Sequence, residues 1–499
     1  MSLVQVTDLT FHYEGSYDDI FQRANFSFDT AWKLGLIGRN GRGKTTFLNL
    51  LMGKYPYRGS IEASVPFEYF PYPVPNMEIP TRAVLGAVCP GAEDWRVERE
   101  LSLLGVDPDV LGRRLSTLSG GERTKALIAG MFLRENSFLL IDEPTNHLDM
   151  AGRAAVAKYL NAQSGFLVVS HDRAFLDASV DHILSVNRAT IEVQAGNFSS
   201  WFYNKELKDN YELEKNARLK KDIRRLTETA REKADWSDRL EATKIGGHAA
   251  DRGRIGHLAA KMMKKSKAIE VRKNREIEEK QKLLKDIERA DSLKIQPLSH
   301  HTARLVDLKD VAIFHGGHEV TRNVNLLVER GARVVLRGGN GSGKTSLIRL
   351  ILGEDLSHTG DVRLASGLRI SYVPQDPSFL SGALEDYIAS CRVDGTLMRT
   401  ILRKFDFPRV QFEKDMADLS AGQKKKVLIA RSLCERAHLY VWDEPLNYVD
   451  VLSRMQIEEL LAEYAPTMLF VEHDAAFCEN VATKVVELTE GGRKCTGGK

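Results

Sequence analysis

The chain lacks long hydrophobic runs, paired cysteines and a strong excess of one charge. No stretch approaches the roughly 18 apolar residues that a spanning helix needs, so we expect that no part of the chain spans a membrane. The N-terminal MSLVQVTDLTFHYEG has no basic segment followed by an apolar core, so we expect no signal peptide. The five cysteines form no CxxC pair, which argues against a thiolate metal site and favours reduced thiols. A cytoplasmic protein is therefore expected.

The size and composition are those of a globular protein with several domains. A chain of 499 residues is too long for one core and indicates about three domains. Its 43% hydrophobic and 28% charged residues are ordinary for a soluble protein. The formal net charge of +3 says little about partners, so the evidence for function has to come from the motifs and their order.

An internal repeat dominates the sequence. Four motifs occur twice in the same order: GLIGRNGRGKTT and VLRGGNGSGKTS, LSGGE and LSAGQ, LLIDEPTNHLD and YVWDEPLNYVD, VVSHD and FVEHD. Lys44 and Ser119 are 75 positions apart, and Lys344 and Ser420 are 76 apart. Four motifs at nearly equal spacing predict a duplicated domain. We place the two domains at 1–204 and 297–499, with a linker at 205–296.

Each repeat is predicted to have an α/β fold. The apolar stretches 34–38 and 333–338 precede glycine-rich loops. The runs after those loops, TTFLNLLMG and TSLIRLILG, have apolar residues at helical spacing and end at glycine. The stretches Phe138–Asp142 and Leu439–Asp443 are predicted to be buried strands that end in an acid. We therefore expect a mainly parallel sheet in each repeat, with functional groups at the carboxyl ends of its strands.

The glycine-rich loops match the phosphate-binding pattern G-x-x-x-x-G-K-[ST]. Glycines let backbone N–H groups converge on phosphate oxygens at the positive end of a helix dipole. Lys44 and Lys344 can place a cation on the phosphates, and Thr45 and Thr345 can bind Mg²⁺. The predicted ATP-binding residues are Gly38, Arg39, Asn40, Gly41, Arg42, Gly43, Lys44, Thr45 and Thr46 in the first repeat, and Gly338, Gly339, Asn340, Gly341, Ser342, Gly343, Lys344, Thr345 and Ser346 in the second.

Acidic residues and histidines follow the later strands of each repeat. Asp142 and Asp443 end two of these strands and can hold Mg²⁺. The next residue in each repeat is a glutamate that can polarise a water for in-line attack on the γ-phosphate. The histidine of the fourth motif is suited to contact the γ-phosphate. The predicted catalytic residues are Glu143, Glu444, His171 and His473.

The LSGGE and LSAGQ segments resemble the signature of ATP-binding cassette proteins. In that superfamily the signature of one domain closes over the ATP held by the other, so ATP joins the halves and hydrolysis releases them. The resemblance implies a monomer whose two cassettes pair with each other. It adds Ser420, Ala421 and Gly422 to the first ATP site and Ser119, Gly120 and Gly121 to the second.

The two ATP sites are not identical in sequence. Cassette proteins usually carry a Mg²⁺-binding glutamine after a strand; the second repeat has it as Gln375, whereas the first has Tyr72. Ala421 replaces a signature glycine, and LNYVD replaces TNHLD. We therefore expect unequal kinetics at the two sites, and we expect Tyr13 to stack on adenine in the first. The predicted Mg²⁺ ligands are Thr45, Asp142, Thr345, Gln375 and Asp443.

The linker is predicted to be an antiparallel helical hairpin. It contains no proline, and four glycines interrupt its middle, in KIGGHAADRGRIGHL. Each arm of ~35–40 residues would span roughly 50–60 Å. Apolar residues at heptad-like spacing mark the first arm, at Leu219, Ile223, Leu226 and Ala230, and the second, at Ile277, Leu284 and Ile287.

The predicted end of the hairpin is basic, with Asp251 as its one acid between Lys244 and Lys267. A basic cluster on glycine-rich backbone is typical of contact with an irregular RNA surface. The residues predicted to contact RNA are Lys244, Arg252, Arg254, His257, Lys261, Lys264 and Lys265.

Two tandem cassettes, no membrane domain and a helical linker resemble the ABC-F family of ribosome-associated ATPases. The family binds the ribosomal E site and points its linker at the peptidyl-transferase centre. The resemblance implies the 70S ribosome as partner, with contacts to 23S rRNA and to an E-site or P-site tRNA.

The long linker tip resembles the antibiotic-resistance branch of that family. The segment between Met77 and Leu118 is too short for the large arm found in factors of general translation. The FEYFPY stretch and the overall length are most like the Lsa-type proteins. That resemblance implies protection against lincosamides, pleuromutilins and streptogramin A, by displacement of the drug.

Three other functions fit parts of the sequence. A housekeeping ABC-F factor would relieve stalled ribosomes without any drug. The ATPase subunit of a transporter would leave the linker unexplained. A nucleotide-gated binding module would hydrolyse ATP only incidentally. The first two, like the resistance protein, are enzymes that convert ATP and water to ADP and phosphate.

Overall fold

The computed structural model describes residues 2–14, 19–146, 148–187, 191–242, 272, 275, 293–316, 318–489 and 492–494. The chain divides into one unit made of Met1–Trp201 and Ala290–Lys499, which holds both repeats, and a second unit, Phe202–Arg289. Within the described part of the chain, no helix combines the length and apolar character that crossing a membrane requires.

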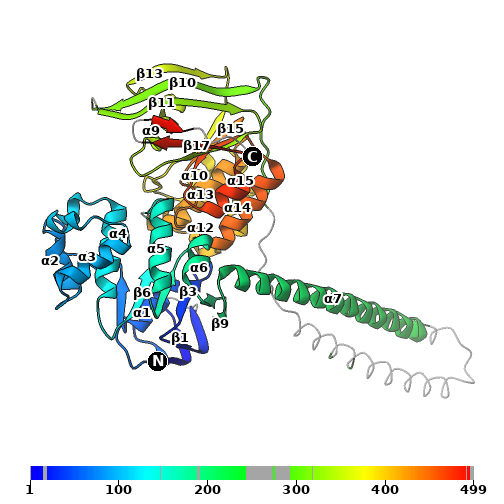
Figure 1. Ribbon diagram of the computed structural model, residues 1–499. Coiled ribbons are helices and arrows are strands. Elements are labelled where there is room, and N and C mark those ends of the chain that lie inside the picture. Colours follow the sequence, from blue (N-terminus) through cyan, green and yellow to red (C-terminus); the bar gives the residue numbers. More distant parts are fainter. Residues whose placement is uncertain are drawn as a thin grey trace, which may run out of the picture. The chain divides into compact units, whose positions relative to one another are not determined.

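The first repeat contains two sheets (Figure 1). An antiparallel sheet has the order β2-β1-β4, from β1 (Leu3–Phe11), β2 (Phe21–Asp29) and β4 (Arg58–Glu62). A six-stranded sheet has the order β5-β6-β7-β3-β8-β9. Its strands are parallel except for the last, and they are β3 (Lys33–Ile37), β5 (Phe67–Phe70), β6 (Phe138–Asp142), β7 (Phe166–Val169), β8 (His182–Val186) and β9 (Ile191–Ala195).

The second repeat has the same two-sheet organisation. Its antiparallel sheet has the order β11-β10-β13, from β10 (Arg304–His315), β11 (His318–Glu329) and β13 (His358–Leu364). The larger sheet has the order β14-β15-β16-β12-β17-β18, and only β18 is antiparallel. Its strands are β12 (Arg333–Arg337), β14 (Ile370–Val373), β15 (Leu439–Asp443), β16 (Met468–Val471), β17 (Lys484–Thr489) and β18 (Gly492–Lys494).

Helices follow the strands of each repeat. The first has α1 (Lys44–Leu51), α2 (Thr81–Val88), α3 (Asp94–Leu103), α4 (Gly120–Phe132), α5 (Met150–Ala162) and α6 (Arg173–Ser179), with 3₁₀ turns at Pro108–Gly112 and Leu115–Thr117. The second has α9 (Lys344–Ile351), α10 (Leu384–Ser390), α11 (Gly395–Lys404), α12 (Arg409–Phe412), α13 (Ala421–Cys434), α14 (Val451–Tyr464) and α15 (Ala475–Val481), with a 3₁₀ turn at Met416–Asp418.

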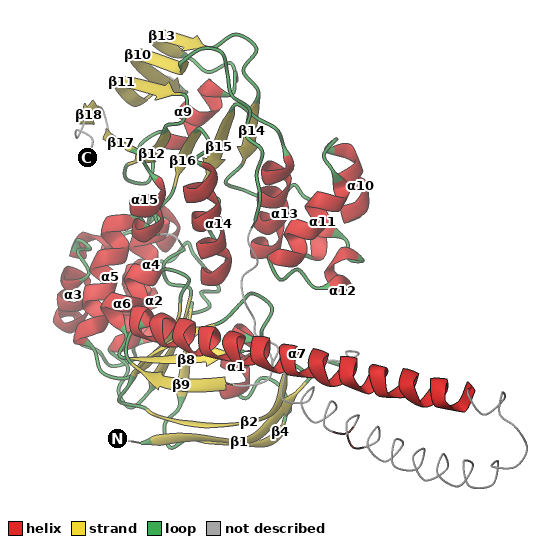
Figure 2. Ribbon diagram, turned by 90° about the vertical axis from the view of Figure 1, so that its right-hand side faces the viewer, coloured by secondary structure: helices red, strands yellow, loops and turns green. Residues whose placement is uncertain are grey.

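Each core is layered around the parallel sheet. In the second repeat, Leu347 and Ile348 of α9 pack in one cluster with Val306 of the antiparallel sheet and Val441 of the parallel sheet, so α9 lies between the two sheets (Figure 2). The opposite face of the parallel sheet is covered by the other helices, where Trp442 is fully buried. The predicted α/β fold with mainly parallel sheets is confirmed. The strands Phe138–Asp142 and Leu439–Asp443 have the predicted bounds, and the strands before the glycine loops end one residue earlier than predicted.

A long helix, α7 (Phe198–Ala242), begins within the predicted first domain and extends over the predicted first arm of the linker. Its half-buried side chains, among those described, are Phe202, Lys205, Asp209, Glu212, Leu213, Asn216, Leu219, Asp222, Ile223 and Leu226. Apart from Leu213 and Asp222 they alternate at spacings of three and four residues, as in a heptad seam, and they include three members of the predicted apolar stripe. The structure thus has a helical insertion between the cassettes. The predicted return stripe at Ile277, Leu284 and Ile287 lies outside the described residues.

Candidate active sites

The phosphate loops connect β3 to α1 and β12 to α9. In the first loop, Lys44 Nζ donates to the carbonyl oxygens of Gly38 at 2.8 Å and of Arg39 at 3.2 Å. Lys344 Nζ makes the equivalent bonds to Gly338 and Gly339, both at 2.8 Å. Burial lowers the pKa of both lysines. Each ammonium is thus buried at the loop that is predicted to hold phosphate.

Glycine is required where each loop enters its helix. Gly43 and Gly343 both have φ of 86°, in the left-handed region that favours glycine. A Cβ on Gly43 would lie 2.4 Å from a methyl carbon of Ile20, so even alanine would clash. The backbone N–H groups at these helix starts are therefore available to an anion.

The acids that end β6 and β15 have different surroundings. Asp142 Oδ2 accepts hydrogen bonds from Thr45 Oγ1 at 3.1 Å and from the Tyr69 hydroxyl at 2.9 Å. Both carboxylate oxygens of Asp443 are buried without a well-formed hydrogen bond, and burial, which outweighs the opposing effect of Thr345, raises the pKa of Asp443 to about 6. Two buried oxygens that can still accept bonds suit a hard cation such as Mg²⁺. The second site fits the metal in this respect. In the first site, the Tyr69 hydroxyl already donates to one carboxylate oxygen of Asp142.

Tyr69 is a site residue that the sequence analysis missed. The comparison with YVPQ directed attention to Tyr72, which is half-buried, rather than to the tyrosine three residues before it. The available signal was that Tyr69 and Tyr372 occupy equivalent positions at the ends of β5 and β14. Gln375, the predicted Mg²⁺ ligand of the second repeat, lines the cavity described below.

The predicted catalytic glutamates pair with the predicted catalytic histidines. His171 Nε2 lies 3.2 Å from Glu143 Oε1, and His473 Nε2 lies 3.4 Å from Glu444 Oε1. Both glutamates have a left-handed backbone, with φ of 49° at Glu143 and 46° at Glu444. A non-glycine residue held in this conformation is typical of a functional site.

The electrostatics of the two glutamates differ. Burial, with a smaller effect from Asp142, raises the pKa of Glu143 to about 8. Burial acts in the same direction on Glu444, but contacts with His473 and Gln375 outweigh it and lower the pKa of Glu444 to about 2. Glu444 is therefore ionised at neutral pH, as a group that polarises water must be, whereas Glu143 is mainly protonated.

Contacts between the repeats lie at the first phosphate loop. Asn40 Nδ2 donates a 2.7 Å hydrogen bond to the Tyr448 carbonyl of the second repeat. Arg42 forms a 2.7 Å ion pair with Asp406. A Cβ on Gly422 would lie 2.6 Å from Asn40 Nδ2. The structure thus brings the predicted signature glycine of the second repeat to the phosphate loop of the first.

The second phosphate loop lines a cavity of about 450 Å³ together with residues of the first repeat. Gly120 of the first signature, Asn146 and Leu148 contribute to its wall. The second repeat contributes Val320, Asn340, Gly341, Ser342, Gly343, Lys344, Thr345, Ser346, Gln375, Glu444 and His473. Predicted binding, metal and catalytic residues of the second site therefore meet in one cavity.

The signature serines begin their helices. Ser119 Oγ accepts from the backbone N–H of Glu122 at 3.1 Å, and Ser420 Oγ accepts from that of Gln423 at 3.3 Å. Each forms a capping box, and Gly120, Gly121, Ala421 and Gly422 lie in the first turns that follow. Contact of these residues with ATP stays a prediction.

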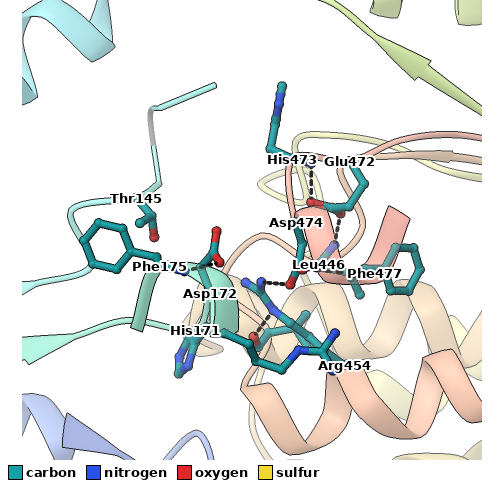
Figure 3. Close-up of polar contacts among 12 residues, drawn as sticks. Thr145, His171, Asp172, Phe175, Leu446, Arg454, Glu472, His473, Asp474 and Phe477 are labelled. Carbon is teal, nitrogen blue, oxygen red and sulfur yellow. Dashed lines mark hydrogen bonds and ion pairs between the residues drawn. The ribbon is translucent and has the colours of Figure 1, made fainter. Parts of the chain in front are cut away.

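Buried arginines near the histidines that are predicted to be catalytic were not themselves predicted. Arg454 of α14 donates to Asp474 at 3.0 Å (Figure 3), and Arg153 of α5 donates to Asp172 at 2.9 Å. Each aspartate follows a catalytic histidine and caps the next helix. Arg173 forms an ion pair with Glu458 across the repeats. The signal for the two buried pairs was the aspartate of the SHD and EHD motifs.

Two further predictions concern Tyr13 and the linker tip. The Tyr13 hydroxyl lies 2.9 Å from Thr46 Oγ1, and its ring packs edge-on against Phe11 and Tyr55. It therefore lies beside the first phosphate loop, and stacking on adenine stays a prediction. The basic residues predicted for RNA contact, Lys244, Arg252, Arg254, His257, Lys261, Lys264 and Lys265, lie outside the described residues.

Known proteins share this organisation. The family model described as "ABC transporter" matches residues 21–146 and 321–447. The chain is 29% identical over 489 residues to the ATP-binding protein Uup of Caulobacter vibrioides, covering 95% of this chain and 75% of that protein. It is 27% identical over 514 residues to the ribosome protection protein VmlR of Bacillus subtilis, covering 98% and 87%. An archaeal ribosome recycling factor, aABCE1, solved with the stalk protein aP1, has the same fold with a TM-score of 0.64, 19% identity and 96% and 87% coverage.

Proposed function

Because this chain belongs to the ABC transporter family, as a two-cassette member of its ABC-F group, we propose that it is a ribosome-binding ATPase that protects bacterial ribosomes from antibiotics. The drugs act at the peptidyl-transferase centre and are lincosamides, pleuromutilins and streptogramin A. The protein enters from the E site, and the tip of its linker displaces the drug. The domains are 1–204, 205–296 and 297–499, and the protein acts in the cytoplasm as a monomer without a membrane partner.

The likeness to VmlR carries this proposal. It extends over 98% of the chain, and so includes the linker as well as both cassettes. That relative is a ribosome protection protein. Among the drug classes, the choice rests on the resemblance of the FEYFPY stretch to Lsa-type proteins.

The catalytic part of the proposal concerns residues that meet in the second site. Lys344 and the loop N–H groups bind the phosphates of ATP, and Glu444 orients and polarises the attacking water, with His473 beside it. Thr345, Gln375 and Asp443 would hold Mg²⁺, which when bound neutralises charge that develops on the phosphates. In the first site Lys44, Thr45, Asp142, Glu143 and His171 take the corresponding roles. Gly422 and Gly120 of the signatures complete the first and second sites respectively.

A drug-susceptibility panel tests the proposed function. A sensitive bacterium that expresses the chain should tolerate higher concentrations of the three drug classes, while its response to a drug of the small ribosomal subunit should not change. The matched control is the Glu143→Gln/Glu444→Gln variant, expressed at the same level, which should give no protection. Unchanged susceptibility to all three classes would contradict drug protection.

Sedimentation with 70S ribosomes separates the remaining functions. Binding to ribosomes in ATP without any drug protection would favour the housekeeping factor. Failure to bind ribosomes, with co-purification of a membrane protein, would favour the transporter subunit. Binding that persists in a chain with no measurable ATP turnover would favour the nucleotide-gated module.

A further inference from the structure

The two repeats differ in one pair of buried side chains beside their catalytic groups. Lys425 lies five residues after Ser420, and the residue five after Ser119 is Thr124. Glu472 precedes His473, and Ser170 precedes His171. Lys425 is 0% exposed and Glu472 is 2% exposed. The second repeat thus buries a cation and an anion where the first has two hydroxyls.

Lys425 joins two loops of the second site. Its Nζ donates to the carbonyl oxygens of Pro374 at 2.8 Å and of Glu444 at 2.9 Å, and it lies 3.5 Å from that of Asp443. Pro374 is the residue before Gln375, the predicted Mg²⁺ ligand. One ammonium therefore ties the glutamine loop to the peptide of the catalytic glutamate.

Glu472 holds the neighbouring segments through its two carboxylate oxygens. Oε1 accepts from the backbone N–H of His473 at 2.8 Å, and Oε2 accepts from that of Leu446 at 3.2 Å (Figure 3). Leu446 is two residues after Glu444. The carboxylate therefore links the histidine segment to the loop that carries the catalytic glutamate.

The first repeat makes weaker links at these positions. Ser170 Oγ lies 3.3 Å from Thr145 Oγ1, and it accepts from the Asp172 backbone N–H at 3.2 Å. These are bonds between neutral groups, whereas hydrogen bonds to an ammonium or a carboxylate are roughly twice as strong. In its described part, the loop of Glu143 thus lacks the hydrogen bonds to an ammonium and a carboxylate that hold the loop of Glu444.

Burying two charges is costly, so this arrangement needs a reason. Burial lowers the pKa of the Lys425 ammonium to about 8, and Glu472 opposes that shift most, ahead of Asp443, Glu444 and Asp376. Glu143 keeps a similar left-handed backbone without such a pair, so the φ of 46° at Glu444 does not by itself require one. Lys425 donates to the carbonyl oxygen of Glu444. This hydrogen bond holds the position of Glu444, and that is a reason to bury the charge despite its cost.

We propose that Lys425 and Glu472 are a pair of positioning residues that hold Glu444 and His473 in register and make the second ATP site the faster one. This proposal rests on the proposed ATPase function. It would explain the expected difference in turnover between the two sites through residues outside the phosphate loops, the signatures and the Mg²⁺ ligands. It acts on the chemical step and not on ATP binding, because neither side chain lines the cavity.

Exchange of the pair for its counterparts tests the proposal. Lys425→Thr, Glu472→Ser and the double variant are made in the full chain in two backgrounds, Glu143→Gln to report the second site and Glu444→Gln to report the first. In the Glu143→Gln background each single change should lower kcat about tenfold or more with KM within about twofold, because a loosened loop misplaces the attacking water. The exposed Lys414→Thr is the matched control and should leave both constants unchanged.

The double variant separates positioning from stability. Each single change removes one of two opposite buried charges that favour each other, so both should lower the melting temperature. The double variant should regain it, since the first repeat folds with two hydroxyls, but its kcat at the second site should stay low. Lys425→Arg, which keeps the cation, should retain more of kcat than Lys425→Thr. In the Glu444→Gln background all these changes should leave turnover within about twofold.

Any of four results would overturn the pair's role. The double variant could turn ATP over at the parental rate, or it could fail to fold. The changes could affect KM rather than kcat, or they could lower turnover equally in the Glu143→Gln and Glu444→Gln backgrounds. If the unsubstituted chain hydrolyses ATP and one of these results is found, only the pair is wrong. If the unsubstituted chain does not hydrolyse ATP, the proposed function fails and the pair's role fails with it.

Discussion

The side-chain amide of Asn40 donates a 2.7 Å hydrogen bond to the backbone carbonyl of Tyr448. Asn40 belongs to the first phosphate loop, and Tyr448, with φ of 64°, belongs to the loop after the catalytic strand of the second repeat. The phosphate loop of the first cassette therefore contacts the second cassette directly, at a residue four positions after Glu444.

Asn40→Ala should weaken the first site more than the second. A lost hydrogen bond costs about 0.5–1.5 kcal/mol, or about two- to tenfold in turnover. We expect that loss in the Glu444→Gln background, which reports the first site, and a smaller one in the Glu143→Gln background. Asn340→Ala is the matched control and should show the opposite pattern. Equal losses for both variants in both backgrounds would contradict a local role.

The Glu143→Gln/Glu444→Gln variant should bind ATP but not turn it over. Gln keeps the size of the side chain and loses the base, so steady-state hydrolysis should fall about 100-fold or more. Without hydrolysis the cassettes should stay closed, and the variant should sediment with ribosomes in ATP more fully than the parent. Hydrolysis at the parental rate would show that these glutamates are not the catalytic groups.

The two sites should respond differently to pH. The pKa of Glu143 is raised to about 8, so this group ionises only as pH rises through that value. The pKa of Glu444 is lowered to about 2, so Glu444 is ionised at all higher pH values. From about pH 6.5 to about pH 7.5, below the pKa of Lys425, turnover of the Glu444→Gln variant should rise, whereas that of Glu143→Gln should stay level. Parallel profiles would contradict the assigned asymmetry.

Much of the fold, and the places of the motif residues within it, could be predicted from the sequence, because the motifs are local. A phosphate loop needs glycine at Gly43 for a backbone reason, and an acid ends β6 at the predicted residue. Strand bounds and the first linker helix follow from the apolar pattern and the lack of proline. Such features depend on neighbours in the chain, so spacing and residue type reveal them.

The features that could not be predicted depend on contacts between distant segments. Tyr69 reaches Asp142 across 73 positions of sequence, and Lys425 reaches Pro374 across 51. Neither residue type is typical of its role, and Lys425 is fully buried although it is one of three consecutive lysines in α13. The different pKa values of Glu143 and Glu444 could not be predicted either, because they come from burial and from contacts with His473 and Gln375.

Shortening the linker loop between Gly246 and Gly256 should abolish protection from the drugs and leave the ATPase intact. The cassettes have their own cores, so their folding does not require this loop, and ATP binding and ribosome sedimentation should persist. The matched variant keeps the loop and replaces Lys261, Lys264 and Lys265 with Ala. It should bind ribosomes less tightly and with a weaker salt dependence, because phosphate contacts release counterions. Susceptibility to lincosamides and pleuromutilins, measured together with ribosome binding, distinguishes a linker that is too short to displace the drug from a protein that binds the ribosome too weakly. If the shortened chain still protects, the linker does not displace the drug, and the housekeeping function becomes the better account.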